Sequence, residues 1–177
     1  MRKIAVVMTV FSLLMVATSA PTLAESGPMA SATFVVPATS GGGTEELGGT
    51  AWFDTGIVLT PGVPVTVSAT GTWLSCKEKT CRTTADGIGV RQVRDCTYIA
   101  PELSAFSLIA KTGKDGAVLI GIGPTVVEGH GKLLLAINDC YFGDNVGGFE
   151  VAIAYPCQPD IDVVYPSNNV CPLPAQS

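Results

Sequence analysis

The segment from Asn138 to Gly148 concentrates the residues of this sequence that are best suited to bind a metal ion. It offers the carboxylates of Asp139 and Asp144 and the side-chain amide of Asn145, with glycines that let the backbone turn sharply. Ca²⁺ is a hard cation that takes about six to eight oxygen ligands from carboxylates, amides and main-chain carbonyls. Two neighbouring carboxylates also repel each other unless a cation neutralises them. We therefore expect a Ca²⁺ site here, completed by main-chain carbonyls near Tyr141.

The same segment has an alternative interpretation as an ordinary turn, because Asn, Asp and Gly are also common turn residues. A catalytic role is less favoured. Asp139 and Asp144 share one short turn, whereas the carboxylates of a glycosidase flank a cleft. His130 is the only histidine, and the chain has no Gly-x-Ser-x-Gly motif. The sequence therefore predicts a binding protein rather than an enzyme.

Four residues outside this segment are further candidates for ligand contact. Trp73 and Trp52 could stack on a sugar ring, although a tryptophan at a strand position more often belongs to the core. Arg94 and Asp95 lie in a polar connection between predicted strands and could hydrogen-bond a ligand. The alternative for this second pair is a solvated loop.

Residues 1–24 have the pattern of a cleavable signal peptide. Met1–Lys3 is positively charged, Ile4–Val16 is apolar, and Thr22–Ala24 supplies small residues at a cleavage point. A retained membrane anchor is the alternative, but the apolar run is shorter than the roughly 20 residues that a spanning helix needs. We therefore expect export to the periplasm or the medium, and no membrane span in the mature chain.

The charge balance of the chain argues against polyanionic partners. The formal net charge is −5, and the leader carries Arg2 and Lys3 but no acidic residue, so the mature chain is more acidic still. An acidic surface disfavours nucleic acid and anionic membranes and is compatible with cations and neutral ligands such as carbohydrates. The sequence does not specify an oligomeric state.

All six cysteines follow the leader, and an even number of cysteines in an exported chain predicts disulfides. Six cysteines allow about fifteen pairings, and the sequence does not select one. A zinc site would need further Cys or His ligands near Cys76 and Cys81. The pairing of near neighbours that we expect is Cys76–Cys81, Cys96–Cys140 and Cys157–Cys171.

The chain after the leader shows the short period-2 runs of β-strands and no helical period. Alternation over 63–69 follows a Pro61-Gly62 turn signal. Residues 106–110 and 117–122 flank Gly113–Gly116 and should form a hairpin. Further strands are expected over 132–137 and 149–155. The fold class predicted is all-β: an antiparallel β-sandwich of jelly-roll or galactose-binding-domain-like type, stabilised by disulfides.

The composition divides the mature chain into three parts. Residues 25–49 are rich in Ser, Gly, Thr and Ala and read as a flexible lead-in, with a possible short strand at Thr33–Val36. The sandwich should occupy residues 50–156. Residues 157–177 are rich in proline, which prevents regular sheet pairing, and are expected to form a disulfide-tied tail.

The stretch from Thr55 to Tyr155 resembles the bacterial calcium-dependent galactophilic lectins of the PA-I type, a branch of the galactose-binding-domain-like β-sandwiches. Four pieces in the same order carry the resemblance. They are Thr55–Gly71 around its Pro-Gly turn, Trp73, Ser107–Gly113 with its returning strand, and Gly131–Asp139 followed by Asp144-Asn145 and Gly148-Phe149.

The resemblance implies a calcium ion held by side chains of the loop and by carbonyls. The side chains would be Asp139, Asp144 and Asn145. One carbonyl would come from the loop and one from Ser75 or Cys76. In that family two vicinal sugar hydroxyls complete the coordination of the ion, because fixed geometry and displaced water favour a matching diol.

This sequence departs from the family pattern in two places. Its loop is about three residues shorter and contains Cys140. The family's His-Pro-x-Gln sugar contacts fall where this chain reads Val93–Cys96, so galactose specificity does not follow. The function predicted is an exported, non-catalytic, calcium-dependent carbohydrate-binding protein. A structural or protein-interaction module of the cell envelope, with calcium only stabilising the loop, is the alternative, and an exported hydrolase is the least favoured.

Overall fold

The computed structural model describes residues 29–41, 49–76, 81–90 and 96–157, and these form an all-β fold with antiparallel strand pairing. Among the described residues no helix is present that is long and apolar enough to cross a membrane. The strands are β1 (Met29–Pro37), β2 (Phe53–Leu59), β3 (Val65–Thr70), β4 (Trp73–Leu74), β5 (Arg82–Thr83), β6 (Leu108–Thr112), β7 (Val118–Leu119), β8 (Thr125–Val127), β9 (Gly131–Ile137) and β10 (Gly148–Pro156).

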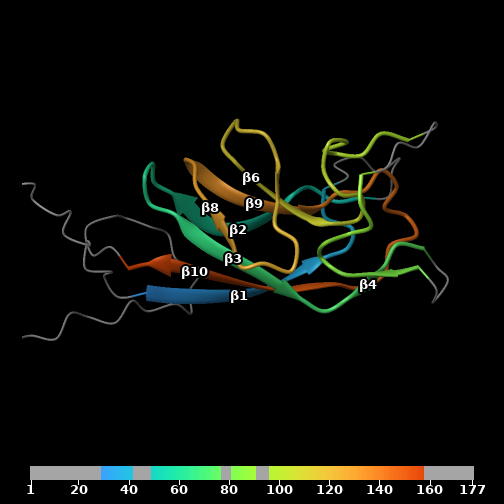
Figure 1. The fold of residues 1–177 in the computed structure, drawn as a ribbon, viewed down its shortest axis with the longest axis horizontal. Coiled ribbons are helices and arrows are strands. Elements are labelled where there is room, and N and C mark those ends of the chain that lie inside the picture. The colour runs from blue at the N-terminus through green and yellow to red at the C-terminus, as the bar shows by residue number, and fades with distance from the viewer. Residues whose placement is uncertain (1–28, 42–48, 77–80, 91–95, 158–177) are drawn as a thin grey trace, which may run out of the picture.

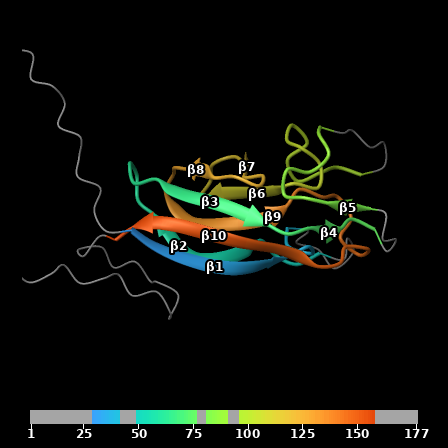
Figure 2. The ribbon, with the colours of Figure 1, turned by 60° about the horizontal axis from the view of Figure 1, so that its bottom comes forward.

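Two four-stranded sheets face each other, as Figures 1 and 2 show. One has the order β1-β10-β3-β8 and the other β2-β9-β6-β7, with β4 and β5 forming a short separate hairpin. Consecutive strands of the sequence therefore cross repeatedly from sheet to sheet. The predicted antiparallel β-sandwich is confirmed.

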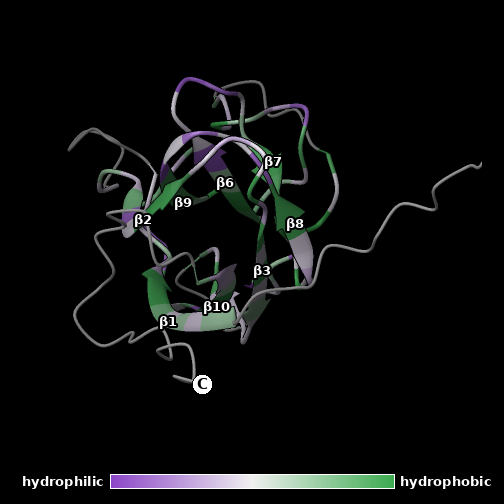
Figure 3. Ribbon diagram, turned by 90° about the vertical axis from the view of Figure 1, so that its left-hand side faces the viewer, coloured by the Kyte–Doolittle hydropathy of each residue, from purple (hydrophilic) through white to green (hydrophobic). Residues whose placement is uncertain are grey.

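The core lies between the sheets because one side chain in two along the strands points inward. In β3 the alternating Val65, Val67 and Ala69 are at most 3% exposed. Val151 and Ile153 of β10 are 0% exposed and lie in the same cluster. Figure 3 looks along the strands and shows β1 and β10 on one side, with β6 and β9 on the other.

The sandwich begins earlier than expected, because β1 occupies part of the predicted 25–49 lead-in. All nine residues of β1 pair with β10, from Met29 opposite Pro156 to Pro37 opposite Gly148. Ala32 and Val36 are buried on its inner side. The prediction was wrong here because serine, alanine and threonine are typical of loops. Small residues fit equally well in a strand whose partner supplies the hydrogen bonds.

The other predicted strands are present, with small shifts at their ends. β6 and β7 form the expected hairpin, with Ile109 opposite Leu119 across the Gly113–Gly116 turn. β8 was not predicted, and it pairs with β3 over three residues. Such a short strand carries too few residues to show a period in the sequence.

Two of the three expected disulfides are present among the described residues. Cys76 is bonded to Cys81 and Cys96 to Cys140, each with a Cα–Cα distance of 5.6 Å. Cys157 is also disulfide-bonded. Its expected partner Cys171 lies outside the described residues, as do the predicted leader and the tail from residue 158 onward. That pairing stays a prediction.

Candidate functional site

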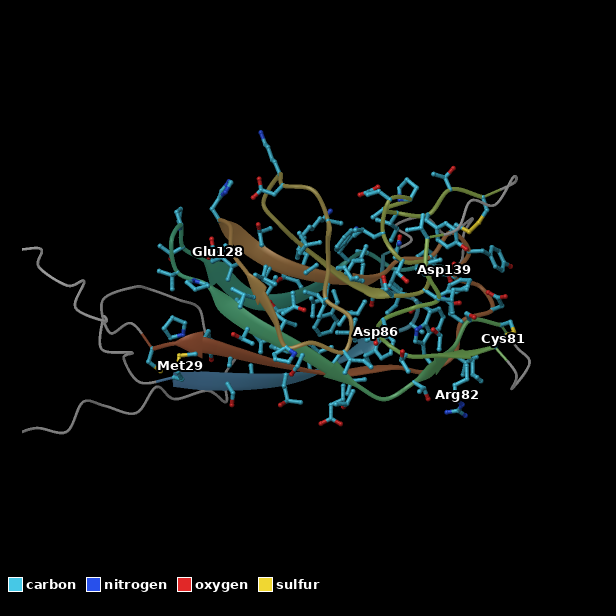
Figure 4. All side chains as sticks on the ribbon, viewed as in Figure 1. Met29, Cys81, Arg82, Asp86, Glu128 and Asp139 are labelled. Atoms are coloured by element: carbon cyan, nitrogen blue, oxygen red, sulfur yellow. A yellow bond between two sulfur atoms is a disulfide. The ribbon has the colours of Figure 1, made fainter. Side chains whose placement is uncertain are left out.

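The loop that follows β9 crosses from one sheet of the sandwich to the other before β10 begins. Figure 4 shows Asp139 of this loop at the same end of the molecule as Cys81 and Arg82, with Met29 at the opposite end. The loop is tied to the β4–β5 hairpin, because Leu74 and Val146 exchange two main-chain hydrogen bonds of 3.0 Å. The candidate site is therefore built by the β9–β10 loop and the hairpin.

Asp139 is a buried carboxylate that accepts three hydrogen bonds. Its side chain belongs to a residue that is only 3% exposed. Oδ1 accepts from the main-chain N–H of Cys140 at 2.7 Å and of Tyr141 at 3.4 Å, and Oδ2 accepts from Nδ2 of Asn145 at 2.9 Å. The loop is thus folded around this carboxylate.

Asn145 connects the carboxylate to the end of β1. Its Nδ2 donates to Oδ2 of Asp139 and to the carbonyl of Ala38, both at 2.9 Å. These two acceptors fix the orientation of the amide. If the amide were flipped, its Oδ1 would face the carbonyl oxygen of Ala38 and Oδ2 of Asp139, and neither of these can donate a hydrogen bond. Oδ1 of Asn145 then faces the other way, and it is buried with no hydrogen-bond donor. A buried acceptor without a donor is costly unless another group satisfies it.

The charge of Asp139 is held in an unfavourable environment. Burial raises the pKa of its carboxyl above the ordinary value of 3.8, and the negative charge of nearby Asp144 raises it further. The hydrogen bonds from Asn145, Cys140 and Tyr141 oppose the shift without cancelling it. A cation beside both carboxylates would favour their ionised forms, so the electrostatics of the loop suit a positively charged ligand.

Asn138, which opens the loop, is a structural residue. It is 0% exposed, its Oδ1 accepts from Ala100 N–H at 2.9 Å, and its Nδ2 donates to the carbonyls of Ala100 and Ser104 at 2.9 Å. Its own carbonyl accepts from Phe106, a residue with a positive φ of 64°. Asn138 therefore holds the 100–106 segment against the start of the loop. This role could not be predicted from the sequence, because its hydrogen-bond partners lie more than 30 residues away along the chain.

The main-chain carbonyls proposed for the site lie on fixed segments. Ser75 follows the Leu74–Val146 bridge by one residue, and its N–H and Oγ both donate to the carbonyl of Cys81, at 3.0 and 3.1 Å. The Cys76–Cys81 disulfide closes the same hairpin. Tyr141 lies in the loop next to Asp139, with an exposed side chain. The structure thus brings Asp139, Tyr141 and Asn145 together.

Trp73 is not a surface platform, which corrects its assignment as a ligand contact. The residue is 1% exposed, its Nε1 donates to the carbonyl of Phe106 at 3.3 Å, and its ring meets that of Phe106 edge-on at 5.9 Å. An indole buried on all sides offers no face to a sugar. Trp52 is half-buried, and the ammonium of Lys111 lies 4.2 Å from its ring centre. Arg94 and Asp95, the other ligand contacts considered, lie outside the described residues.

The side chains available as metal ligands carry little negative charge. Within the described ranges no group of three or more His, Cys, Asp or Glu side chains is arranged to hold a metal ion. The oxygens that the loop offers are two carboxylates, the Oδ1 of Asn145 and main-chain carbonyls. This set is unsuited to zinc, which prefers nitrogen and sulfur. It matches the oxygen chemistry of a weakly held Ca²⁺.

Comparison with solved structures gives a neighbour of the same architecture. It is the EclA N-terminal domain, described as a PllA-like lectin, with a TM-score of 0.50 and 23% identity over 75% of this chain and 100% of that domain. No family profile and no curated protein sequence matches the chain. At this identity the likeness concerns the fold alone. The described residues therefore form a β-sandwich with the fold of a lectin domain.

Proposed function

We propose that this chain is an exported, non-catalytic protein that binds carbohydrate through a calcium ion in the β9–β10 loop, as in the PA-I type lectins. Asp139, Asp144 and Asn145 would hold the ion with main-chain carbonyls from Tyr141 and Ser75. When bound, Ca²⁺ supplies coordination positions that two vicinal hydroxyls of a sugar can fill.

One observation carries this proposal: Oδ1 of Asn145 is buried without a donor next to the buried carboxylate of Asp139. Both groups cost free energy in the folded protein. Oδ1 of Asn145 lacks a hydrogen-bond donor, and Asp139 carries a buried negative charge when it is ionised. A hard cation satisfies both at once. Oδ1 belongs to the amide whose Nδ2 bonds Asp139, so both groups lie in the same part of the loop.

The proposal is supported by the rigidity of the loop. Asn138 and the Cys96–Cys140 disulfide fix its beginning, and the bridge from Leu74 to Val146 fixes its end. Pre-positioned ligands lower the entropy cost of binding an ion and a diol. The fold neighbour is described as a lectin, which is consistent with a carbohydrate ligand.

Calcium is expected to stabilise the protein against heat. With two carboxylates the site should be weak, with a Kd on the order of 10⁻⁴–10⁻³ M. In about 10 mM CaCl₂ the melting temperature should then rise by about 3–11 °C over its value in EDTA. Differential scanning calorimetry measures the rise, with MgCl₂ at the same ionic strength as the control. An unchanged melting temperature would exclude the calcium site.

The size of this increase should depend on pH. Because the pKa of Asp139 is raised in the folded protein, its contribution to stability without calcium is present below 3.8 and is lost as pH rises through the folded pKa. Calcium binding needs the ionised carboxylate, so calcium affinity increases as the pH rises. The calcium-dependent increase in melting temperature should therefore grow as the pH rises through the folded pKa of Asp139 and shrink as the pH falls toward 3.8.

A second candidate function, a structural module of the cell envelope, is favoured by the contact between Asn145 and the carbonyl of Ala38. That contact ties the loop to the connection after β1, so an ion there could serve stability alone. Both functions predict the thermal shift. Only the first predicts that a sugar binds in the presence of calcium.

A further inference from the structure

Tyr141 is the one aromatic residue among those described that is largely exposed, and it lies in the candidate loop. Its side chain belongs to a residue that is 52% exposed. The other aromatic side chains in the described ranges serve the core. Those that are at most 5% exposed are Trp73, Tyr98, Phe142, Phe149 and Tyr155, and those that are half-buried are Phe34, Trp52, Phe53 and Phe106.

The main chain at Tyr141 is held by its neighbours, and its ring lies over Gly143. Its main-chain N–H donates to Oδ1 of Asp139 at 3.4 Å. Cys140 before it is in a disulfide, and Phe142 after it is 1% exposed. The ring crosses Gly143 so closely that a Cβ there would lie 2.8 Å from Oη and 3.0 Å from Cζ of Tyr141. A larger residue at position 143 would therefore push the end of the ring aside.

Exposed apolar side chains flank the oxygen-bearing residues of the loop in the sequence. Tyr141 is on one side of Asp144 and Asn145 in the loop. Val146 is on the other, 54% exposed and fixed by its main-chain bonds to Leu74. A sugar has the matching chemistry, because its ring combines hydroxyls with a face of C–H groups that can pack on an aromatic ring.

We propose that Tyr141 is the aromatic platform of the site, on which the C–H face of a pyranose packs while its hydroxyls meet the ion. This inference rests on the proposed function and names the ligand class more closely, as a pyranose with a continuous C–H face next to a vicinal diol. A tyrosine ring supplies a large contact area at a small cost in side-chain entropy, because few of its bonds rotate.

The test compares Tyr141→Ala and Tyr141→Phe with the wild type and with Val126→Ala. Val126 is an exposed residue of β8, 62% exposed and outside the loop. The probes are galactose, glucose, mannose, fucose and N-acetylglucosamine, each coupled to a polymer and titrated in CaCl₂. Tyr141→Ala should weaken binding of the best probe about ten-fold, as expected for loss of an aromatic contact. Tyr141→Phe should restore it, and Val126→Ala should match the wild type.

Gly143→Ala gives a second test, because it displaces the ring without removing it. It should weaken binding in the wild-type background and have no further effect in a Tyr141→Ala background, as a double-mutant cycle would show. In all these variants the calcium-dependent rise in melting temperature reports whether the loop is intact, since the main chain and Asp139 are unchanged.

The outcomes separate this inference from the function on which it rests. If the wild type binds a probe and Tyr141→Ala binds it within about two-fold, with its calcium shift intact, the platform is excluded and the lectin function stands. If the folded wild type with a full calcium shift binds none of the probes, the carbohydrate-binding function fails and the platform fails with it.

Discussion

Replacing Asp139 by alanine is expected to abolish both the calcium-dependent rise in melting temperature and calcium-dependent sugar binding. Asp139 is the buried carboxylate at the centre of the loop, 3% exposed and bonded to Asn145. Without it the remaining oxygens carry one negative charge at most, which is too little to compete with the hydration of Ca²⁺. Calorimetry with and without calcium measures the loss.

The alanine variant also leaves three donors without an acceptor, so it should be less stable by about 1–3 kcal/mol even in EDTA. Asp144→Asn is the milder companion, because it removes one charge and keeps the shape. It should weaken calcium binding on the order of ten-fold. It should also lower the pKa of Asp139, since the charge of Asp144 contributes to raising it.

The matched control is Asp54→Asn, the same chemical change on β2. Asp54 is an exposed carboxylate paired with Lys132 at 2.6 Å, and that hydrogen bond lowers its pKa. An exposed pair contributes at most about 1 kcal/mol. The control should therefore change stability slightly and leave the calcium shift unchanged. A full calcium shift in Asp139→Ala would contradict the assignment of the site.

Removing the Cys96–Cys140 disulfide is expected to have the second large effect. The bond closes a loop with a sequence separation of 44 residues, for which the chain-entropy relation gives about 4 kcal/mol. Replacing both cysteines by alanine should lower the free energy of unfolding by that order in a urea titration without calcium. The corresponding variant of Cys76 and Cys81, with a separation of 5, should lose about 2 kcal/mol.

The first of these variants should also bind calcium more weakly. Cys140 donates its N–H to Asp139 at 2.7 Å, so freeing Cys140 loosens the carboxylate that holds the ion. Titration calorimetry with CaCl₂, at a temperature where the variant is folded, gives the affinity. Equal calcium affinity with and without the disulfide would show that the loop is positioned by its hydrogen bonds alone.

Most strands could be predicted because their signals are local, and the two disulfides seen agree with the near-neighbour pairing that we expected but that the sequence does not select. The alternation of Val65, Val67 and Ala69 predicts one buried face, and the Gly113–Gly116 turn predicts a hairpin. Only the short strand at Thr33–Val36 was considered for β1, and its full length could not be predicted, because its nine pairs with β10 join residues more than 100 positions apart. No pattern within Met29–Pro37 predicts that this segment pairs with β10.

The sequence suggested the residue types of the candidate site, which stay a prediction, but not their arrangement. Asp139, Asp144 and Asn145 were recognisable from oxygen chemistry and from the family resemblance. The sequence could not show that Asn145 turns its Nδ2 to Asp139 and Ala38 and leaves its Oδ1 without a donor. It also suggested Trp73 as a sugar platform, whereas the structure buries this residue, because exposure depends on which side chains the opposing sheet covers.

The most direct test of the central claim is a glycan array probed with the wild-type protein in calcium and in EDTA. Calcium-dependent sugar binding at the β9–β10 loop predicts signal on a set of glycans that share a vicinal diol, present in calcium and absent in EDTA. A folded protein that gives no signal in either buffer, or equal signal in both, would contradict it.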